Sequence, residues 1–219
     1  MATKWGWGLV ALAGVAVLAA LAVVSTEKGR TVPEIMRAAG CTYRDVTPLP
    51  PKPGSRDDYH QDVPTLSSPV RWATFPPSGG SHFRLWATWG FYRKAVNPRM
   101  VVHNEEHGGV VIWWGPDVPP STVDQLEAFY RSSPVAVFGT PIAGLGSKIA
   151  LTAWNADPRW TGEPGLAYKH GYYGTGRIAI CPAFDENAFA AFRDAYRGKS
   201  PQGFPIEGDR PGCGPEKPC

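Results

Sequence analysis

The sequence predicts an α+β protein, with a small mixed or antiparallel sheet, helices packed on one face of it, and one N-terminal transmembrane helix before it. Three features support this fold class: short apolar runs bounded by glycine or proline, two amphipathic segments with helical spacing, and a long uncharged stretch near the N-terminus. The chain has 219 residues, of which 43% are hydrophobic, enough for one domain with a core.

The N-terminal apolar stretch contains no charged residue between Lys4 and Glu27. Its length matches the ~20 apolar residues that cross a bilayer as a helix. We therefore expect residues 7–25 to contact the lipid bilayer and residues 1–30 to form an anchor with its flanks. The alternative is a cleaved signal peptide with its cleavage site at Ala20–Ala22. Both alternatives place the C-terminal domain on the extracytoplasmic side of a cell membrane.

Beyond the anchor, we expect an extracytoplasmic domain over residues 31–198 and a tail over residues 199–219 that is rich in proline and glycine. A short helix is predicted within residues 31–40, where proline lies near the start and glycine at the end. The proline-rich segment 48–77 cannot form long helices or central strands, so we expect an ordered loop that wraps the core.

The remaining pattern is regular. Short apolar runs predict strands over residues 109–114, 148–154 and 177–181. Apolar residues at helical spacing predict helices over residues 121–131 and 185–196. Ser121 is the expected N-cap of the first helix, because Asp124 three residues later completes a capping-box arrangement.

Cysteine usage agrees with export. The even number of cysteines favours disulfides in an oxidising compartment, and the four are Cys41, Cys181, Cys213 and Cys219. Three pairings are possible, and we favour Cys41–Cys181 together with Cys213–Cys219. The absence of a C-x-x-C motif gives no support to a thioredoxin-type redox site or a zinc ribbon.

Two classes of partner are not expected. The net charge is only +3 and the basic residues are scattered, whereas a nucleic-acid binder shows a basic stripe. The sequence "GTPIAGLGSK" has no G-K-[ST] ending, so it is not a phosphate loop and we expect no nucleotide. A protein partner in the cell envelope is compatible with the predicted location.

The sequence "VVHNEEHGGVVIWW" contains the main candidates for chemistry. On a helix, the i, i+4 spacing of His103 and His107 places both imidazoles on one face, within reach of one metal ion. The motif is not the H-E-x-x-H of metalloproteases, because Asn104 occupies the position of the glutamate.

Three other residues complete the predicted metal site. His82 follows a turn of prolines and glycines, which suits a rigidly held third ligand. Glu106 is expected as a fourth ligand or as the carboxylate that orients an imidazole, and His60 is a weaker candidate. Histidine and carboxylate ligands without a thiolate suit zinc or copper(II).

A structural role is the alternative for these side chains. A buried pair of histidine and glutamate often only satisfies its own polar atoms. In that case the protein is a non-enzymatic accessory or interaction protein of the cell envelope. The sequence fixes no reaction, so whether the protein is an enzyme stays open.

Several segments together resemble a known family. The stretches "FPPSGGSHF", "WGFY", "VHNEEHGGVVIWW" and "KIALTAW" are similar to bacterial membrane-anchored extracytoplasmic domains that form the domain of unknown function 3105 family. The resemblance extends from Cys41 to Gln202 and implies export, anchoring and a shared histidine-rich centre, without an established reaction. The matching positions are His60, His82, His103, Glu106 and His107.

The sequence departs from the family pattern at two places. Ser78 directly follows the proline pair, and an extra Gly80 precedes Ser81. Glu105 stands where the family usually has leucine, which predicts a second carboxylate beside the site.

Overall fold

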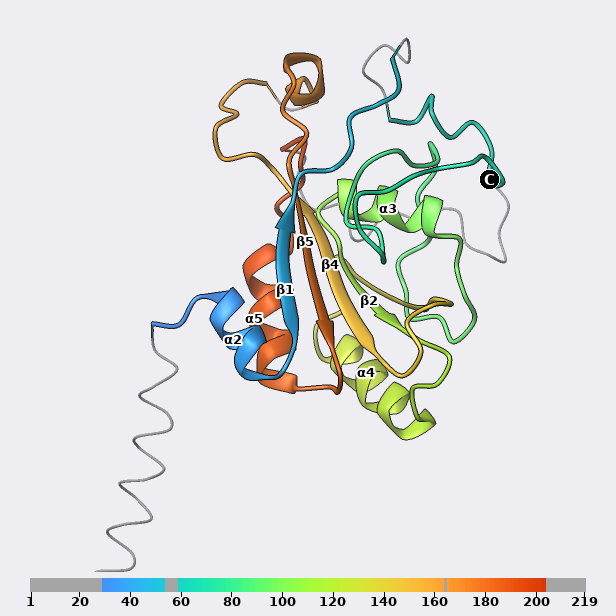
Figure 1. Ribbon diagram of the computed structural model, residues 1–219, viewed down its shortest axis with the longest axis vertical. Coiled ribbons are helices and arrows are strands. Elements are labelled where there is room, and N and C mark those ends of the chain that lie inside the picture. The colour runs from blue at the N-terminus through green and yellow to red at the C-terminus, as the bar shows by residue number, and fades with distance from the viewer. Residues whose placement is uncertain (1–28, 54–58, 164, 204–219) are drawn as a thin grey trace, which may run out of the picture.

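The computed structural model describes residues 29–53, 59–163 and 165–203 (Figure 1). Its centre is a five-stranded sheet with the order β1-β5-β4-β2-β3. The strands are β1 (Thr42–Val46), β2 (Val110–Trp114), β3 (Val137–Pro141), β4 (Ile149–Asn155) and β5 (Thr175–Cys181). The helices are α2 (Val32–Ala38), α3 (Pro98–Glu106), α4 (Pro120–Ser132) and α5 (Glu186–Tyr196), with a 3₁₀ turn η1 (Ala167–His170).

The sheet is mixed. β2 and β3 pair in parallel, and α4 forms the crossover between them, whereas the pairs β1–β5, β5–β4 and β4–β2 are antiparallel. In the middle of the sheet, Ile112 lies opposite Gly139 on one side and Leu151 on the other. The predicted α+β class with a small mixed sheet is therefore confirmed.

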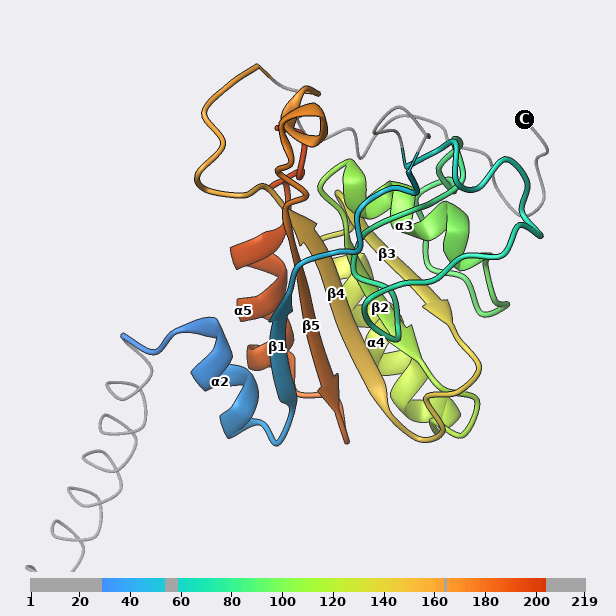
Figure 2. The same cartoon turned by 45° about the horizontal axis from the view of Figure 1, so that its top comes forward.

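Helices cover both faces of the sheet, which corrects the expectation of helices on one face only (Figure 2). On what we call the three-helix face, α2, α4 and α5 pack against side chains such as Ile112 and Leu151. On the other, called the α3 face, α3 and residues within the segment 83–96 pack against Val111 and Trp113. The reason is visible in β2: all five of its residues are buried, so neither face of this strand can be left in water.

The predicted helices and strands are present, with small differences at their ends. α4 begins at Pro120, one residue earlier than expected, and its N-cap is Pro119. The expectation that Ser121 caps this helix is therefore wrong, because Ser121 lies inside the first turn. Proline suits the first helical position, where its missing N–H would have no partner within the helix.

A disulfide joins Cys41, just before β1, to Cys181 at the end of β5. This is the pairing favoured from the sequence, and both cysteines are buried in the core of the three-helix face. The other expected pair, Cys213–Cys219, lies outside the described residues.

The predicted membrane span, residues 7–25, also lies outside the described residues. Over residues 29–53, 59–163 and 165–203, we find no helix with the length and apolarity needed to cross a bilayer.

Candidate metal centre

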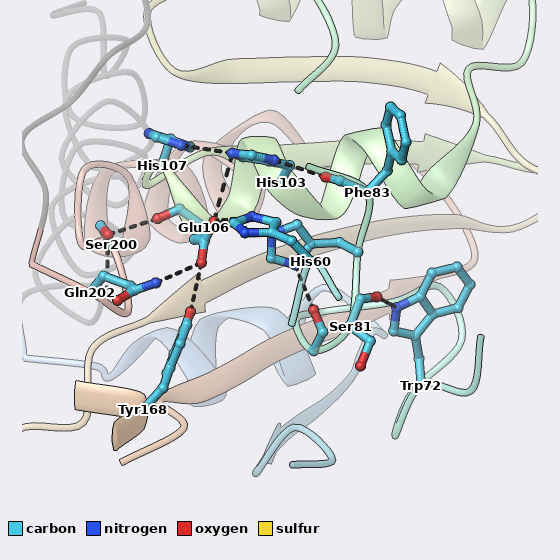
Figure 3. A network of polar contacts seen from close by, with 12 residues as sticks. His60, Trp72, Ser81, Phe83, His103, Glu106, His107, Tyr168, Ser200 and Gln202 are labelled. Atoms are coloured by element: carbon cyan, nitrogen blue, oxygen red, sulfur yellow. Dashed lines mark hydrogen bonds and ion pairs between the residues drawn. The ribbon is translucent and has the colours of Figure 1, made fainter. Parts of the chain in front are cut away.

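Four side chains from three segments converge on the α3 face (Figure 3). Each offers one nitrogen or oxygen atom, and these atoms all lie within 4.8 Å of one another. We call this group the His/Glu cluster; its members are His60, His82, His103 and Glu106. Of the predicted ligands, the structure thus brings together four, including His60, which the sequence ranked lowest.

The helix α3 places two members of the cluster. Asn97 caps its N-terminus by accepting a hydrogen bond from the backbone of Arg99, and Pro98 occupies the first helical position. His103 and Glu106 are three residues apart and therefore lie on the same side of the helix, with their Nε2 and Oε2 atoms 3.7 Å apart. The helix ends at Glu106, so the carboxylate lies at the boundary between the helix and the following turn.

His82 is held by the glycine turn before it. Gly79 and Gly80 have φ angles of +118° and +105°, which favour glycine. A Cβ atom on Gly79 would also lie only 2.7 Å from the Trp154 ring, so this position cannot carry a side chain without movement of its neighbours. The turn lets the carbonyl oxygen of Gly80 accept a hydrogen bond from Nδ1 of His82 at 2.7 Å.

The two buried histidines present the same ring nitrogen to the cluster. Nδ1 of His82 contacts a backbone carbonyl, and Nδ1 of His103 likewise contacts the carbonyl oxygen of Phe83 at 2.9 Å. A carbonyl can only accept, so Nδ1 carries the hydrogen in both rings. In the neutral ring, Nε2 then has a lone pair directed into the cluster. Histidines that bind a metal through one ring nitrogen typically donate a hydrogen bond from the other, which fixes the orientation of the ring.

The spacing of the atoms suits a single ion. Oε2 of Glu106 lies 3.1 Å from Nε2 of His82 and 3.4 Å from Nε2 of His60. Ligands bound at ~2.0–2.1 Å to a tetrahedral ion lie ~3.3 Å apart, close to these values. The lone pairs of a carboxylate and a neutral imidazole repel at such distances unless a proton or a metal ion lies between them.

The protonation states also suit metal binding. Burial lowers the pKa of His103 to about 3, so this ring is neutral at neutral pH. Burial opposes ionisation of Glu106, yet His82 and His60 beside it hold the pKa of the carboxyl well below its usual range. Deprotonated carboxylate and neutral imidazole are the forms that bind metal ions.

The second carboxylate oxygen of Glu106 is occupied by protein groups. Tyr168 donates to Oε1 at 3.0 Å and the amide of Gln202 donates at 2.8 Å. Ser200 donates to the main-chain oxygen of the same residue at 2.7 Å. Oε1 is thus engaged by the protein, and Oε2 faces the histidines (Figure 3). These contacts therefore fix the orientation of the carboxylate from the side opposite the histidines.

No sequence pattern marks these three supporting residues. Tyr168 is 62 positions from Glu106 and Gln202 is 96 positions from it. Ser200 and Gln202 belong to the segment that the sequence assigned to the tail, and both are buried here. No local pattern marks such contacts, because they depend on how distant segments pack. A hydrogen bond between Gly198 and Gly108 brings the segment against the end of α3.

His107, which the sequence ranked among the main ligands, is placed at the edge of the cluster. Its Nε2 lies 2.9 Å from Nε2 of His103, but it is not one of the four mutually close residues. The ring of Trp86 lies against both histidines, with centroid distances of 5.4 Å to His103 and 5.2 Å to His107.

Glu105, expected as a second carboxylate beside the site, is not a member of the His/Glu cluster. Its Oε1 accepts a hydrogen bond from Thr152 on β4. Successive residues of a helix point about 100° apart, which directs Glu105 toward the sheet while Glu106 faces the histidines. Burial raises the pKa of Glu105 well above its usual value, so this side chain is a neutral acid in the core.

Comparison with known proteins adds one match. A family model described as "Protein of unknown function (DUF3105)" matches residues 64–203. This range contains every member of the His/Glu cluster except His60. Neither the curated proteins nor the solved structures contain a match.

Proposed function

The chain belongs to the DUF3105 family of proteins of unknown function, and we propose that it binds one divalent metal ion through its His/Glu cluster. Zinc and copper(II) are the proposed ions, because imidazole and carboxylate ligands without thiolate suit both.

The principal support is the orientation of the two buried imidazoles. His82 and His103 both donate through Nδ1 to a backbone carbonyl and direct Nε2 at the carboxylate of Glu106. With Nδ1 donating to a carbonyl, Nε2 of His82 meets the carboxylate of Glu106 at 3.1 Å, a contact that needs either a proton or a cation between the two atoms. A metal ion bound between Nε2 and Oε2 would satisfy both atoms.

The burial of the cluster suits a firmly held ion. The side chains of His82, His103 and Glu106 are at most 5% exposed, whereas that of His60 is 31% exposed. An ion held there can act as a Lewis acid or lower the pKa of bound water when a coordination position is open. Such chemistry needs ligands with a fixed geometry. The hydrogen bonds from Tyr168 and Gln202 to Oε1 of Glu106 supply it for the carboxylate.

Metal analysis of the full chain tests this proposal. The protein should be purified without a histidine tag, exposed to zinc or copper(II), and dialysed in a non-chelating buffer. We expect about one ion per chain, and a loss of most of it in His82→Ala. His170→Ala is the matched control, because His170 is exposed and stacks on Trp160 outside the cluster.

The same measurement can also contradict the proposal. Less than about a tenth of an ion per chain, with a melting temperature that the metal does not change, contradicts the proposal, since a ligand of the folded state must stabilise it. The cluster would then be structural, as expected for an envelope accessory or interaction protein.

We also propose that residues 7–25 anchor the protein in the cell membrane, with the domain on the extracytoplasmic side. The support is the uncharged stretch between Lys4 and Glu27, together with a disulfide, Cys41–Cys181, of the kind that persists in oxidising compartments. Membrane fractionation with protease treatment of intact cells tests this location. A soluble mature protein with a new N-terminus near Val23 would contradict anchoring.

A further inference from the structure

A cavity of about 440 Å³ lies where β4 ends, β5 begins and the segment 198–203 follows α5. Its volume falls within the range of ~300–1,000 Å³ that is typical of small-molecule sites. No member of the His/Glu cluster lines it, so it is a separate feature of the molecule. The described residues of its lining are Asn155, Ala156, Pro158, Arg177, Tyr196, Gly198, Lys199, Ser200 and Gly203.

The lining of this cavity carries positive charge. Arg177 and Lys199 are both part of it, and none of its described residues is acidic. Asp45 pairs with Arg177 from outside the lining, whereas Lys199 is exposed. A hollow surrounded by charge of one sign attracts a ligand of the opposite sign. The cavity therefore favours an anion.

Arg177 keeps one edge of its guanidinium group available to a ligand. Nη1 donates to Asp45 on the neighbouring strand β1. Nε is buried and has no hydrogen-bond partner in the part of the chain that the structure describes. The guanidinium carbon lies 5.2 Å from the centroid of the Tyr196 ring. A guanidinium binds a carboxylate through two parallel N–H groups, and Nε and Nη2 form such an edge.

Asn155 adds an acceptor to the same cavity. Its side chain is buried, and Nδ2 donates to the main-chain oxygens of Tyr196 and Lys199 at 2.9 Å and 3.0 Å. A carbonyl oxygen can only accept, so these two bonds fix which end of the amide is nitrogen. Oδ1 has no donor among the described residues. A buried acceptor without a donor is unfavourable, so an N–H group of a ligand would complete it.

We propose that this cavity binds a small organic carboxylate that has a neutral N–H group beside the carboxylate and an apolar side chain, such as an N-acylated amino acid. The carboxylate bonds to the free edge of Arg177 and lies near the ammonium group of Lys199. The N–H donates to Oδ1 of Asn155, and the apolar side chain packs on Tyr196 and Pro158. A free amino group fits less well, because it brings a third positive charge.

The proposal does not depend on metal binding by the His/Glu cluster. Isothermal titration calorimetry of the full chain, purified without added metal, tests it with N-acetyl-L-phenylalanine as the probe. We expect one saturable site per chain. The amide of the same compound lacks the carboxylate, and 3-phenylpropionate lacks the N–H group. Each should bind about tenfold more weakly or worse, because each leaves polar groups of the cavity without a partner.

Two variants place the probe in the cavity. Arg177→Lys keeps the charge but removes the planar edge, and it should weaken binding about tenfold. Lys199→Gln removes an exposed charge and should weaken binding about threefold. Lys148→Gln is the matched control, because Lys148 is an exposed lysine just before the opposite end of β4, and it should bind the probe like the wild type. Urea denaturation verifies that the variants fold, and Lys199→Gln decides if Arg177→Lys does not.

Three results would overturn the proposal. A wild-type chain that shows no saturable binding has no such site. Equal affinity for the probe and its amide removes the role of the positive charges, and equal affinity for 3-phenylpropionate removes that of Asn155. Equal affinity of Lys199→Gln and Lys148→Gln places the ligand elsewhere on the chain. The proposed metal binding stands or falls separately, by the metal content of the same protein.

Discussion

The two faces of the sheet are built in different ways. On the three-helix face, α2, α4 and α5 bury apolar side chains such as Leu126 and Phe189 at helical spacing, and the core they form is almost wholly apolar. On the α3 face, one short helix and an irregular segment bury His82 and His103 beside a carboxylate. The first face gains stability from apolar burial, while the second holds polar groups whose burial costs free energy unless each has a partner.

This difference suggests that the three-helix face mainly determines the stability of the fold and that the α3 face mainly determines metal binding. Changes on the three-helix face should lower the free energy of unfolding and leave metal affinity unaltered in the molecules that stay folded. Changes around the His/Glu cluster should lower the metal affinity and leave the free energy of unfolding largely unaltered.

Phe189→Ala on α5 should have the largest effect on stability. Phe189 is fully buried, with its ring centroid 5.0 Å from that of Phe184 and 6.1 Å from that of Phe129. Removing a buried phenylalanine side chain leaves a cavity and lowers the free energy of unfolding by about 3–5 kcal/mol. Urea denaturation measures the loss. Below the unfolding transition the variant should still bind one metal ion, and a loss of metal from the folded variant would show that the two faces are coupled.

Tyr168→Phe should have its main effect on metal affinity. The hydroxyl of Tyr168 donates to Oε1 of Glu106 and helps to fix the carboxylate. Loss of such a supporting hydrogen bond typically weakens metal binding by about 10–100-fold. Competition with a chromophoric chelator measures the affinity, and Tyr130→Phe on α4 is the control from the other face. An unchanged affinity in Tyr168→Phe would mean that Gln202 alone orients the carboxylate.

Glu105→Gln should have the smallest effect of the three variants. The change that it causes in the free energy of unfolding should depend on pH. Below pH 4.5 the carboxyl is protonated in both the folded and the unfolded chain. As pH rises above that value, the unfolded chain releases this proton while the folded chain retains it, because burial raises the folded-state pKa. The free energy of unfolding of the wild type therefore falls with rising pH.

Glutamine removes this loss, so the stability of Glu105→Gln relative to wild type should increase from pH 4.5 toward neutral pH. Urea denaturation of both metal-free proteins across this range measures the difference. A difference that decreases with pH would show that Glu105 is ionised in the folded state.

The three-helix face was largely predictable, and the α3 face was not. Residues 185–196 have an aromatic stripe at helical spacing, and the corresponding helix, α5, spans Glu186–Tyr196. In contrast, β1 was not predicted, because Tyr43 is its only buried residue and the alternation of an edge strand is weak there. β3 also escaped prediction, since its five residues include a glycine and a proline.

The site was predicted in part for a related reason. The spacing of His103, Glu106 and His107 within one motif identified the region, and His82 was identified from its glycine turn. The relative positions of His60 and His107 could not be predicted, because they depend on how the segment before α3 folds over the sheet. The supporting contacts from Tyr168, Ser200 and Gln202 come from still more distant segments and left no signal in the sequence.

Anomalous X-ray diffraction from crystals of the zinc-loaded protein tests the central claim most directly. We predict one anomalous peak per chain on the α3 face, at about 2.0–2.2 Å from Nε2 of His82, Nε2 of His103 and Oε2 of Glu106. His60 should complete the shell at a similar distance. A peak elsewhere on the chain, or crystals without any peak in which these side chains keep their spacing and bond only to protein atoms, would contradict the account.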